Sequence, residues 1–428
     1  MDKKFIRSFL IFGGTAGFSR ILPVAMLPIY LSSLGSNDYG IVEVVFAIFN
    51  CLIIFGQLQL ETSLQRLYYK VDNQSDLFSS IFVMTLIASV LVTIVACFFS
   101  EAISTLIFKT EDESTLIVIA ASCILFANIS SIYMIVLRYM DRAVTFTVLS
   151  LGQASISALF SYFFIVDMNI GGVGYFYGLL TGWVFQTVFG SIYIFKRFSF
   201  GFHLRYSSLA LSFAMPQFPA RLASFFVQYA NRFFVLSIVG VQAVALMSLS
   251  LKFAAIFQLL MLAFSMAWNP FIYKNENNLD LNLKVNKIFK CLLAILVFIH
   301  IITLLSSGFI INEYFNEEFS EANDYVALAI IPFQLLIIKE IVESGVKLAN
   351  KTKYMSISYF VSAAFSGLLM CFSSSLVDIL LSSISGTLLL VVLSWYFSLK
   401  NHYLTYSKLW FFTYLLVIVI SVMITMKV

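Results

Sequence analysis

Long apolar stretches separated by short polar segments run along almost the whole chain. A membrane-spanning helix needs about 20 mostly apolar residues. We predict helices at residues 8–33, 40–60, 78–100, 114–138, 146–166, 173–195, 208–238, 241–268, 286–309, 324–348, 355–373, 377–398 and 408–426. Strands of a membrane β-barrel would instead alternate in polarity over segments of about ten residues. The unbroken apolar stretches therefore predict an all-α, polytopic membrane protein.

Composition supports this interpretation. Of the 428 residues, 61% are apolar and 11% are charged, and the mean hydropathy is +0.95. Two or three soluble domains of this total length would need far more polar surface.

The first stretch is too long for the core of a signal peptide, so we expect a retained helix. The last stretch, 408–426, either spans the membrane or lies at its interface, and we favour a span.

The charges between the apolar stretches predict an orientation. Lysine and arginine favour cytoplasmic loops. With Lys3, Lys4 and Arg7 inside, most of the 26 basic residues fall in inner loops, whereas the outer segments near 101–113 and 310–324 are acidic. The formal net charge of +4 therefore reflects membrane topology. The basic residues are spread over many short loops, so we expect no nucleic-acid partner.

Five basic residues instead lie within apolar stretches: Arg20, Arg221, Arg232, Lys252 and Lys339. A charge at bilayer depth costs roughly 2.5–3.5 kcal/mol on insertion scales, so such residues generally have a function. Several cations directed into one protein interior would suit an anionic substrate that crosses the membrane.

The chain divides near residue 197, in a basic polar loop that follows six predicted helices. We expect a six-helix lobe at 1–197, a second at 198–400, and an extra spanning or interfacial helix at 401–428. The two lobes open alike, because each first helix carries a mid-depth arginine and ends at a glycine turn. The matching features are Pro23, Pro28, Arg20 and Gly35 in the first lobe, and Pro216, Pro219, Arg221 and Gly240 in the second. Paired halves with broken helices are common in transporters.

Two segments resemble a known family. Residues 22–45, LPIYLSSLGSNDYGIVEVV and the residues beside it, are similar to the first hairpin of bacterial polysaccharide flippases. Residues 216–273 resemble their seventh and eighth helices. The matching elements are Pro216, Asn231-Arg232-Phe233, Gly240 and Trp268-Asn269-Pro270. These flippases are the O-antigen and capsule repeat-unit transporters of the multidrug/oligosaccharidyl-lipid/polysaccharide superfamily. Asn231 departs from the pattern, because an acidic residue often precedes the arginine in the family.

The resemblance implies two six-helix bundles around a central cavity that opens alternately to the two sides of the inner membrane. The implied substrate is an oligosaccharide repeat unit on undecaprenyl pyrophosphate, moved from the cytoplasmic to the outer leaflet. Membrane lipids surround such a protein, and a polysaccharide polymerase and a chain-length regulator are candidate partners. A thirteenth helix would depart from the usual twelve spans.

We assign the deep cations Arg20, Arg221, Arg232 and Lys252 to substrate binding in the cavity. Arg221 and Arg232 are eleven residues apart, which on one continuous helix places them about 20° apart around the axis and roughly 16 Å apart along it. The planar donor fork of arginine suits a pyrophosphate. Alternatively, these arginines bond backbone carbonyls that the nearby prolines leave free, and Lys252 pairs with a carboxylate on another helix.

Arg66, Arg138 and Arg142 stand at inner helix ends, where they are either topology anchors or an inner rim that collects the diphosphate. Tyr68 and Tyr69 are expected in the interfacial aromatic belt, although they could also stack on sugars.

A charged cluster on the tenth predicted helix contains Lys339, Glu340, Glu343 and Lys347. The i,i+4 spacing predicts a self-neutralised ladder. A coupling-ion or gating element is the alternative, for which Glu43 and Glu61 are further candidates. His300 is expected to be a packed, neutral histidine rather than a proton shuttle.

No nucleophile–base constellation, metal-ligand spacing or nucleotide-binding loop appears, so we expect no cofactor, no metal and no enzyme activity. Three alternatives stay open. A drug/cation antiporter of the same superfamily should carry acidic residues deep in its cavity. A polysaccharide polymerase or ligase should have a large outer loop. A membrane scaffold would have no use for arginines at mid-depth.

Overall fold

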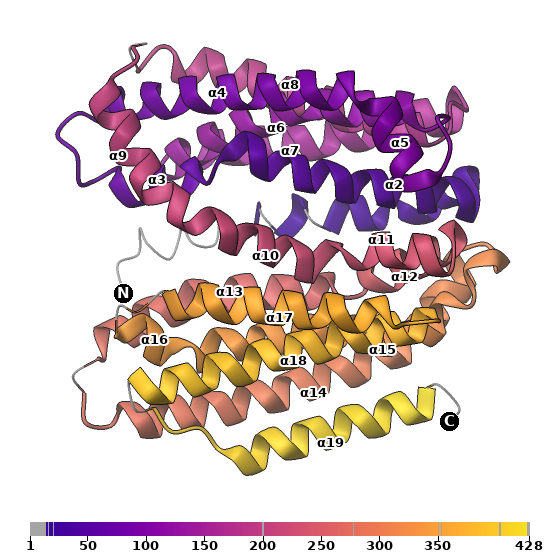
Figure 1. Cartoon of the computed structure of the whole chain (residues 1–428), viewed down its shortest axis with the longest axis vertical. Coiled ribbons are helices and arrows are strands. Elements are labelled where there is room, and N and C mark those ends of the chain that lie inside the picture. Colours follow the sequence, from indigo (N-terminus) through magenta and orange to yellow (C-terminus); the bar gives the residue numbers. More distant parts are fainter. Residues whose placement is uncertain are drawn as a thin grey trace. The chain divides into compact units, whose positions relative to one another are not determined.

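The computed structural model describes residues 14–425, apart from residues 16, 20, 199–200, 277, 350, 352 and 402–403. Every described regular element is a helix, and each of the thirteen predicted stretches has a helical counterpart (Figure 1). The chain forms two compact units, residues 1–225 and 226–428. We placed the division between lobes earlier, near residue 197. The position at which two transport lobes separate stays a prediction.

The first unit begins with helical turns among residues 14–25. Its further elements are α2 (Leu27–Gln57), α3 (Leu60–Leu67), α4 (Gln74–Phe98), α5 (Ser100–Phe108), α6 (Ser114–Tyr139), α7 (Ala143–Tyr162), the π-helical η1 (Phe163–Asp167), α8 (Gly172–Ile194), α9 (Leu204–Ala214) and the 3₁₀-helical η2 (Met215–Gln217). The helix α10 (Phe218–Tyr229) carries the chain into the second unit. Within the first unit, α6 packs between α4 and α8, and α7 packs on α8 (Figure 1).

The second unit contains α11 (Asn231–Ile238), α12 (Val241–Lys252), α13 (Ala255–Lys274), α14 (Leu281–Tyr314), η3 (Glu317–Phe319), α15 (Ala322–Val342), α16 (Ser344–Leu348), α17 (Lys353–Cys371), α18 (Leu376–Asn401) and α19 (Lys408–Thr425). The helix α15 is the centre of this unit, because it packs against α12, α13, α14, α18 and α19. The most apolar segment of α15 is 83% buried within the protein, compared with 33% for the corresponding segment of α14. The side chains of α15 therefore face protein rather than lipid.

The two predicted glycine turns are present. Gly35 interrupts α2 with φ 70° and ψ 174°, and Gly240 precedes α12 with φ 120°. A residue with a Cβ atom rarely adopts these values of φ, so glycine allows the chain to turn sharply at both positions.

One predicted helix is not continuous in the structure. We expected a single helix over 208–238, whereas the structure divides this stretch into α9, η2, α10 and α11. Pro216 lies inside η2, where a proline cannot donate the backbone bond of a regular α-helix. The separation of Arg221 and Arg232 calculated for one continuous helix therefore does not apply.

Among the described residues, eight helices are long and apolar enough to cross a membrane. They are α2, α4, α6, α7 with η1, α14, α15, α17 and α18. The pair α12 and α13, bent by 44° at its break, would be a ninth span. The chain is therefore a multi-pass, all-helical membrane protein.

The helix α19 belongs to the second unit through a polar contact with α14 and α15. The imidazole of His300 lies 2.7 Å from Gln334 and 2.8 Å from Ser421 Oγ, and Tyr414 donates to Gln334 Oε1 at 2.9 Å. His300 and Gln334 are fully buried. Since buried polar side chains cost free energy unless they are bonded, this network fixes α19 against its neighbours.

Candidate functional site

The second unit buries one of the predicted cavity cations. Arg232, on α11, is 6% exposed. Its guanidinium carbon lies 5.3 Å from the centre of the Tyr229 ring, and Nη1 lies 3.5 Å from both the Gln228 carbonyl and Asn231 Oδ1. An aromatic ring, a backbone carbonyl and a side-chain amide are thus among the groups that contact this guanidinium. The side chain of Lys252, the last residue of α12, is half-buried where the α12–α13 pair bends.

A small cavity lies beside the Asn231-Arg232 step. It has a volume of about 20 Å³, and its polar lining comes from Gln228, Asn231, Ser383 and Thr387. A space of this size holds about one water molecule. The cavity is too small for a sugar.

The structure describes one of the two other predicted cavity arginines. The side chain of Arg221, on α10, is exposed in the first unit. Arg20 lies outside the described residues. Arg221 belongs to the first unit, whereas Arg232 and Lys252 belong to the second. A common site of the four residues that we assigned to the cavity stays a prediction.

The predicted inner-rim arginines are all exposed at helix ends of the first unit. Arg66 lies in the last turn of α3, Arg138 in the last turn of α6, and Arg142 immediately before α7. A hydrogen bond joins two of these helix ends, because Tyr69 donates its hydroxyl to the Tyr139 carbonyl at 2.6 Å. The three arginines are accessible to a ligand.

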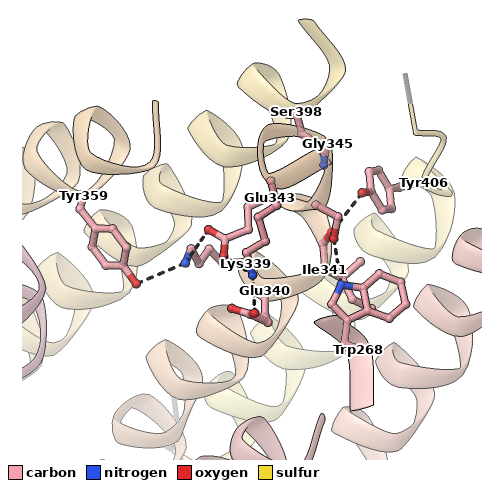
Figure 2. A network of polar contacts seen from close by, with 11 residues as sticks. Trp268, Lys339, Glu340, Ile341, Glu343, Gly345, Tyr359, Ser398 and Tyr406 are labelled. Carbon is pink, nitrogen blue, oxygen red and sulfur yellow. Dashed lines mark hydrogen bonds and ion pairs between the residues drawn. The ribbon is translucent and has the colours of Figure 1, made fainter. Parts of the chain in front are cut away.

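A buried charge network, formed by Lys339, Glu340, Glu343 and Lys347, lies where α15 ends and α16 begins (Figure 2). Lys339 Nζ lies 2.6 Å from Glu343 Oε2, and Lys347 Nζ lies 2.9 Å from Glu343 Oε1. Lys347 also pairs with Glu340. The side chains of Lys339 and Glu343 are only 7% and 1% exposed. Both predicted i,i+4 pairs are present, and two lysines balance two glutamates.

Other helices complete this network. The Lys339 ammonium lies 4.8 Å from the centre of the Tyr359 ring and 3.4 Å from its hydroxyl (Figure 2). Burial lowers the pKa of Lys347, but the nearby carboxylates of Glu343 and Glu340 outweigh this effect and raise it above the ordinary lysine value. Lys347 therefore stays charged.

The break between α15 and α16 is tied to the rest of the second unit. The Trp268 indole donates to Ser344 Oγ at 2.8 Å, Tyr406 donates to the Ile341 carbonyl at 3.1 Å, and the Gly345 amide donates to Ser398 Oγ at 2.8 Å. The last two bonds satisfy backbone groups at this break, where helix ends leave such groups without partners, and the first joins two side chains. The sequence did not indicate them, because serines and aromatic residues occur throughout the chain.

The two other candidate carboxylates lie in the first unit. Glu43, on α2, is 3% exposed and accepts from the Tyr39 hydroxyl at 3.0 Å. Glu61, on α3, is half-buried and accepts from Ser131 Oγ at 3.0 Å. Neither contact assigns a coupling role, which stays a prediction for both.

Comparison with known proteins decides the family. The model of a family described as polysaccharide biosynthesis protein matches residues 5–276. The chain belongs to this family. No curated protein sequence matches the chain.

Solved structures with a similar fold include several transporters. The chain is similar to the lipid II flippase MurJ in an inward closed conformation, with 18% identity, coverage of 97% of this chain and 92% of that one, and a TM-score of 0.75. An inward-facing MATE-family multidrug transporter has 15% identity, coverage of 89% and 94%, and a TM-score of 0.70. A transporter of the MOP superfamily from Pyrococcus furiosus has 13% identity, coverage of 94% and 96%, and a TM-score of 0.56. This family member therefore has a fold like that of MurJ and the MATE transporters.

Proposed function

We propose that this protein carries a lipid-linked oligosaccharide across the membrane, as a transporter rather than an enzyme. The observation that carries the proposal is the buried guanidinium of Arg232 in a polysaccharide biosynthesis protein with the fold of a lipid II flippase. A charge buried at bilayer depth is costly and generally has a function, and the planar fork of an arginine fits a diphosphate.

The substrate in this proposal is an O-antigen or capsule repeat unit on undecaprenyl pyrophosphate, and the site of action is the bacterial inner membrane. Arg66, Arg138 and Arg142 attract the diphosphate from the cytoplasmic side. Arg20, Arg221, Arg232 and Lys252 then bind it at mid-depth. The polyprenyl chain stays in the lipid while the two lobes expose the head group to each side in turn. A polymerase and a chain-length regulator would receive the product.

The transport must be driven without nucleotide hydrolysis, because the sequence has no ATP-binding loop. An ion gradient, the membrane potential or removal of the product outside can supply the driving force. Glu43, Glu61 and the charge network contain the carboxylates that an ion-coupled mechanism would use.

A complementation experiment tests the proposal. A strain that lacks this gene should lose surface polysaccharide, and the intact gene should restore it. We expect Arg221→Gln and Arg232→Gln to restore less than a tenth of the polymer at equal membrane levels, because each removes a charge for the diphosphate. Arg221→Lys keeps the charge without the planar fork and should restore an intermediate amount.

Lys109 provides the control, because its ammonium is exposed and bonds only locally, to the Leu106 carbonyl at 3.1 Å. We expect Lys109→Gln to restore the polymer fully. Full restoration by both arginine variants would contradict the role of the cations.

Cation antiport is the second candidate function, and buried Glu43 is the observation that favours it. An antiporter that uses this carboxylate should confer resistance to cationic drugs, and Glu43→Gln should abolish that resistance. We expect deletion of the gene to leave drug susceptibility unchanged and to affect only the polysaccharide.

A further inference from the structure

Three tyrosines form a fixed aromatic group at one end of the first unit, which we call the tyrosine platform: Tyr68, Tyr69 and Tyr139. The rings of Tyr69 and Tyr139 are stacked, with centroids 5.5 Å apart and an interplanar angle of 30°. Tyr68 meets both rings edge-on, at 5.2 Å and 5.3 Å. Tyr68 is 3% exposed and packs in the apolar core of the unit. The platform therefore has a buried base.

The outer ring of the platform is accessible and held in place. Tyr69 is 69% exposed, although its hydroxyl donates to the Tyr139 carbonyl at 2.6 Å. A tyrosine of the interfacial belt directs its hydroxyl to water or head groups. The Tyr69 hydroxyl is instead bonded to protein, and one face of the ring lies against Tyr139. A ligand that contacts the other face of the Tyr69 ring would therefore cost little further side-chain entropy.

Basic residues lie next to the platform along the chain. Arg66 precedes Tyr69 by three residues, and Arg138 is adjacent to Tyr139. The turn after α6 brings the backbone of Arg142 back to the last turn of that helix. Asp141 adopts φ 56° in this turn, and the Arg142 amide donates to the Leu137 carbonyl at 2.8 Å. Lys70 adds a further positive charge, whereas Asp72 and Asp141 offset part of it.

A helix-end role explains part of this arrangement. Arg66 and Arg138 lie in last turns, where cations complement the negative end of the helix dipole. The Tyr69 hydroxyl satisfies a carbonyl that the end of α6 leaves free. Neither role requires an exposed aromatic ring at a helix end that also carries arginines. That combination suits a ligand that carries a flat, weakly polar ring next to strong negative charge.

We propose that the tyrosine platform binds the first sugar of the diphosphate-linked substrate while Arg138 and Arg142 bind its diphosphate. The negative face of an aromatic ring attracts the polarised C–H bonds on one face of a pyranose, and guanidinium groups bond phosphate oxygens in pairs. This subsite rests on the proposed function and deepens it. It predicts that the protein recognises the sugar before the head group enters the membrane.

A binding experiment with two probes tests the subsite. The full chain is placed in nanodiscs of phosphatidylcholine, which has no net charge. One probe is a short-chain prenyl diphosphate that carries a single N-acetylhexosamine, and the other is the same prenyl diphosphate without sugar. We expect Tyr69→Ala to weaken binding of the sugar probe five- to tenfold and to leave the bare probe within twofold. Arg142→Gln should weaken both probes.

Two control variants separate ring stacking from structure. Tyr69→Phe removes the hydroxyl bond but keeps the ring, so the sugar probe should bind within twofold of the wild type. Tyr396 is 57% exposed on α18 and stands outside the platform. We expect Tyr396→Ala to leave both affinities unchanged.

The outcomes distinguish the subsite from the proposed function. If the wild type binds both probes but Tyr69→Ala weakens both equally, or neither, the subsite is wrong and diphosphate binding stands. If Tyr69→Phe and Tyr69→Ala lose equal affinity for the sugar probe, the role of Tyr69 is to bond the end of α6 through its hydroxyl, and the subsite is wrong. If the wild type binds neither probe, the subsite and the proposed function both fail. If added phosphatidylglycerol displaces the bare probe in the wild type but not in Tyr69→Ala, the platform binds a lipid head group instead.

Discussion

The charge network of the second unit and the basic end of the first unit, formed by Arg66, Arg138 and Arg142, place their basic residues in opposite surroundings. In the network, the side chains of Lys339 and Lys347 are only 7% and 12% exposed, and both ammonium groups lie within 3 Å of the Glu343 carboxylate. At the basic end, Arg138 and Arg142 are exposed at helix ends. Removing one partner from a group of buried, balanced charges is strongly destabilising. Each charge in such a group is already paired, so it is poorly placed to bind a ligand. Exposed guanidinium groups contribute little to stability and are available to an anion.

Removal of Glu343 should have the largest effect. Glu343→Gln leaves two buried ammonium groups without their shared carboxylate, a change that typically costs about 3–5 kcal/mol. We expect the thermal unfolding midpoint of the purified protein to fall by roughly 10 °C. The double variant Glu343→Gln/Lys339→Met, which removes one excess charge, should recover part of the loss. An unchanged midpoint in Glu343→Gln would end the interpretation of the network as structural.

Neutralising two arginines of the basic end should lower transport and leave stability unchanged. In Arg138→Gln/Arg142→Gln we expect transport of a lipid-linked sugar to fall about tenfold, which corresponds to about 1.4 kcal/mol. The unfolding midpoint should stay within about 1 °C of the wild type, because exposed side chains rarely contribute more than about 0.5 kcal/mol. A lowered midpoint with normal transport would assign these arginines to stability.

The neutral network around His300 offers an intermediate case. Tyr414→Phe removes the donor to Gln334 Oε1 and leaves a buried amide oxygen with one bond fewer, at a cost of about 1–2 kcal/mol. We expect a measurable drop in the unfolding midpoint and normal transport. Loss of transport without loss of stability would show that α19 takes part in function rather than only in packing.

Alkaline pH should have the smallest effect. The raised pKa of Lys347 means that its ion pairs stabilise the folded protein fully below the ordinary lysine pKa, and that this stabilisation is lost only as pH rises through the higher folded value. The stability difference between the wild type and Lys347→Met should therefore be equal at pH 7 and pH 9. A difference that shrinks by pH 9 would contradict the ion pairing.

The sequence predicted the helices well, because apolar stretches of spanning length have few alternatives in a membrane. The turns at Gly35 and Gly240 and the pairs of Lys339–Glu343 and Glu343–Lys347 also followed from local patterns. The continuity of the stretch 208–238 was wrong, because the effect of Pro216 on the backbone depends on the packing around it.

Contacts between distant residues could not be predicted. Tyr69 and Tyr139 are 70 residues apart, and His300 and Ser421 are 121 apart. Nothing in the periodicity of either segment specifies its partner, and each pairing depends on which helices pack together. For the same reason, the sequence could not specify that Arg232 contacts the ring of Tyr229 and the side chain of Asn231.

Reconstituted transport tests the central claim most directly. Proteoliposomes would carry a fluorescent undecaprenyl diphosphate-linked sugar, and an impermeant quencher would report how much label changes leaflet with time. We expect wild-type protein to move the sugar-linked lipid at least tenfold faster than protein-free vesicles, and Arg232→Gln to approach the protein-free rate. Equal rates for the wild type and Arg232→Gln, or no acceleration by the wild type, would contradict a carrier in which buried guanidinium groups bind the diphosphate.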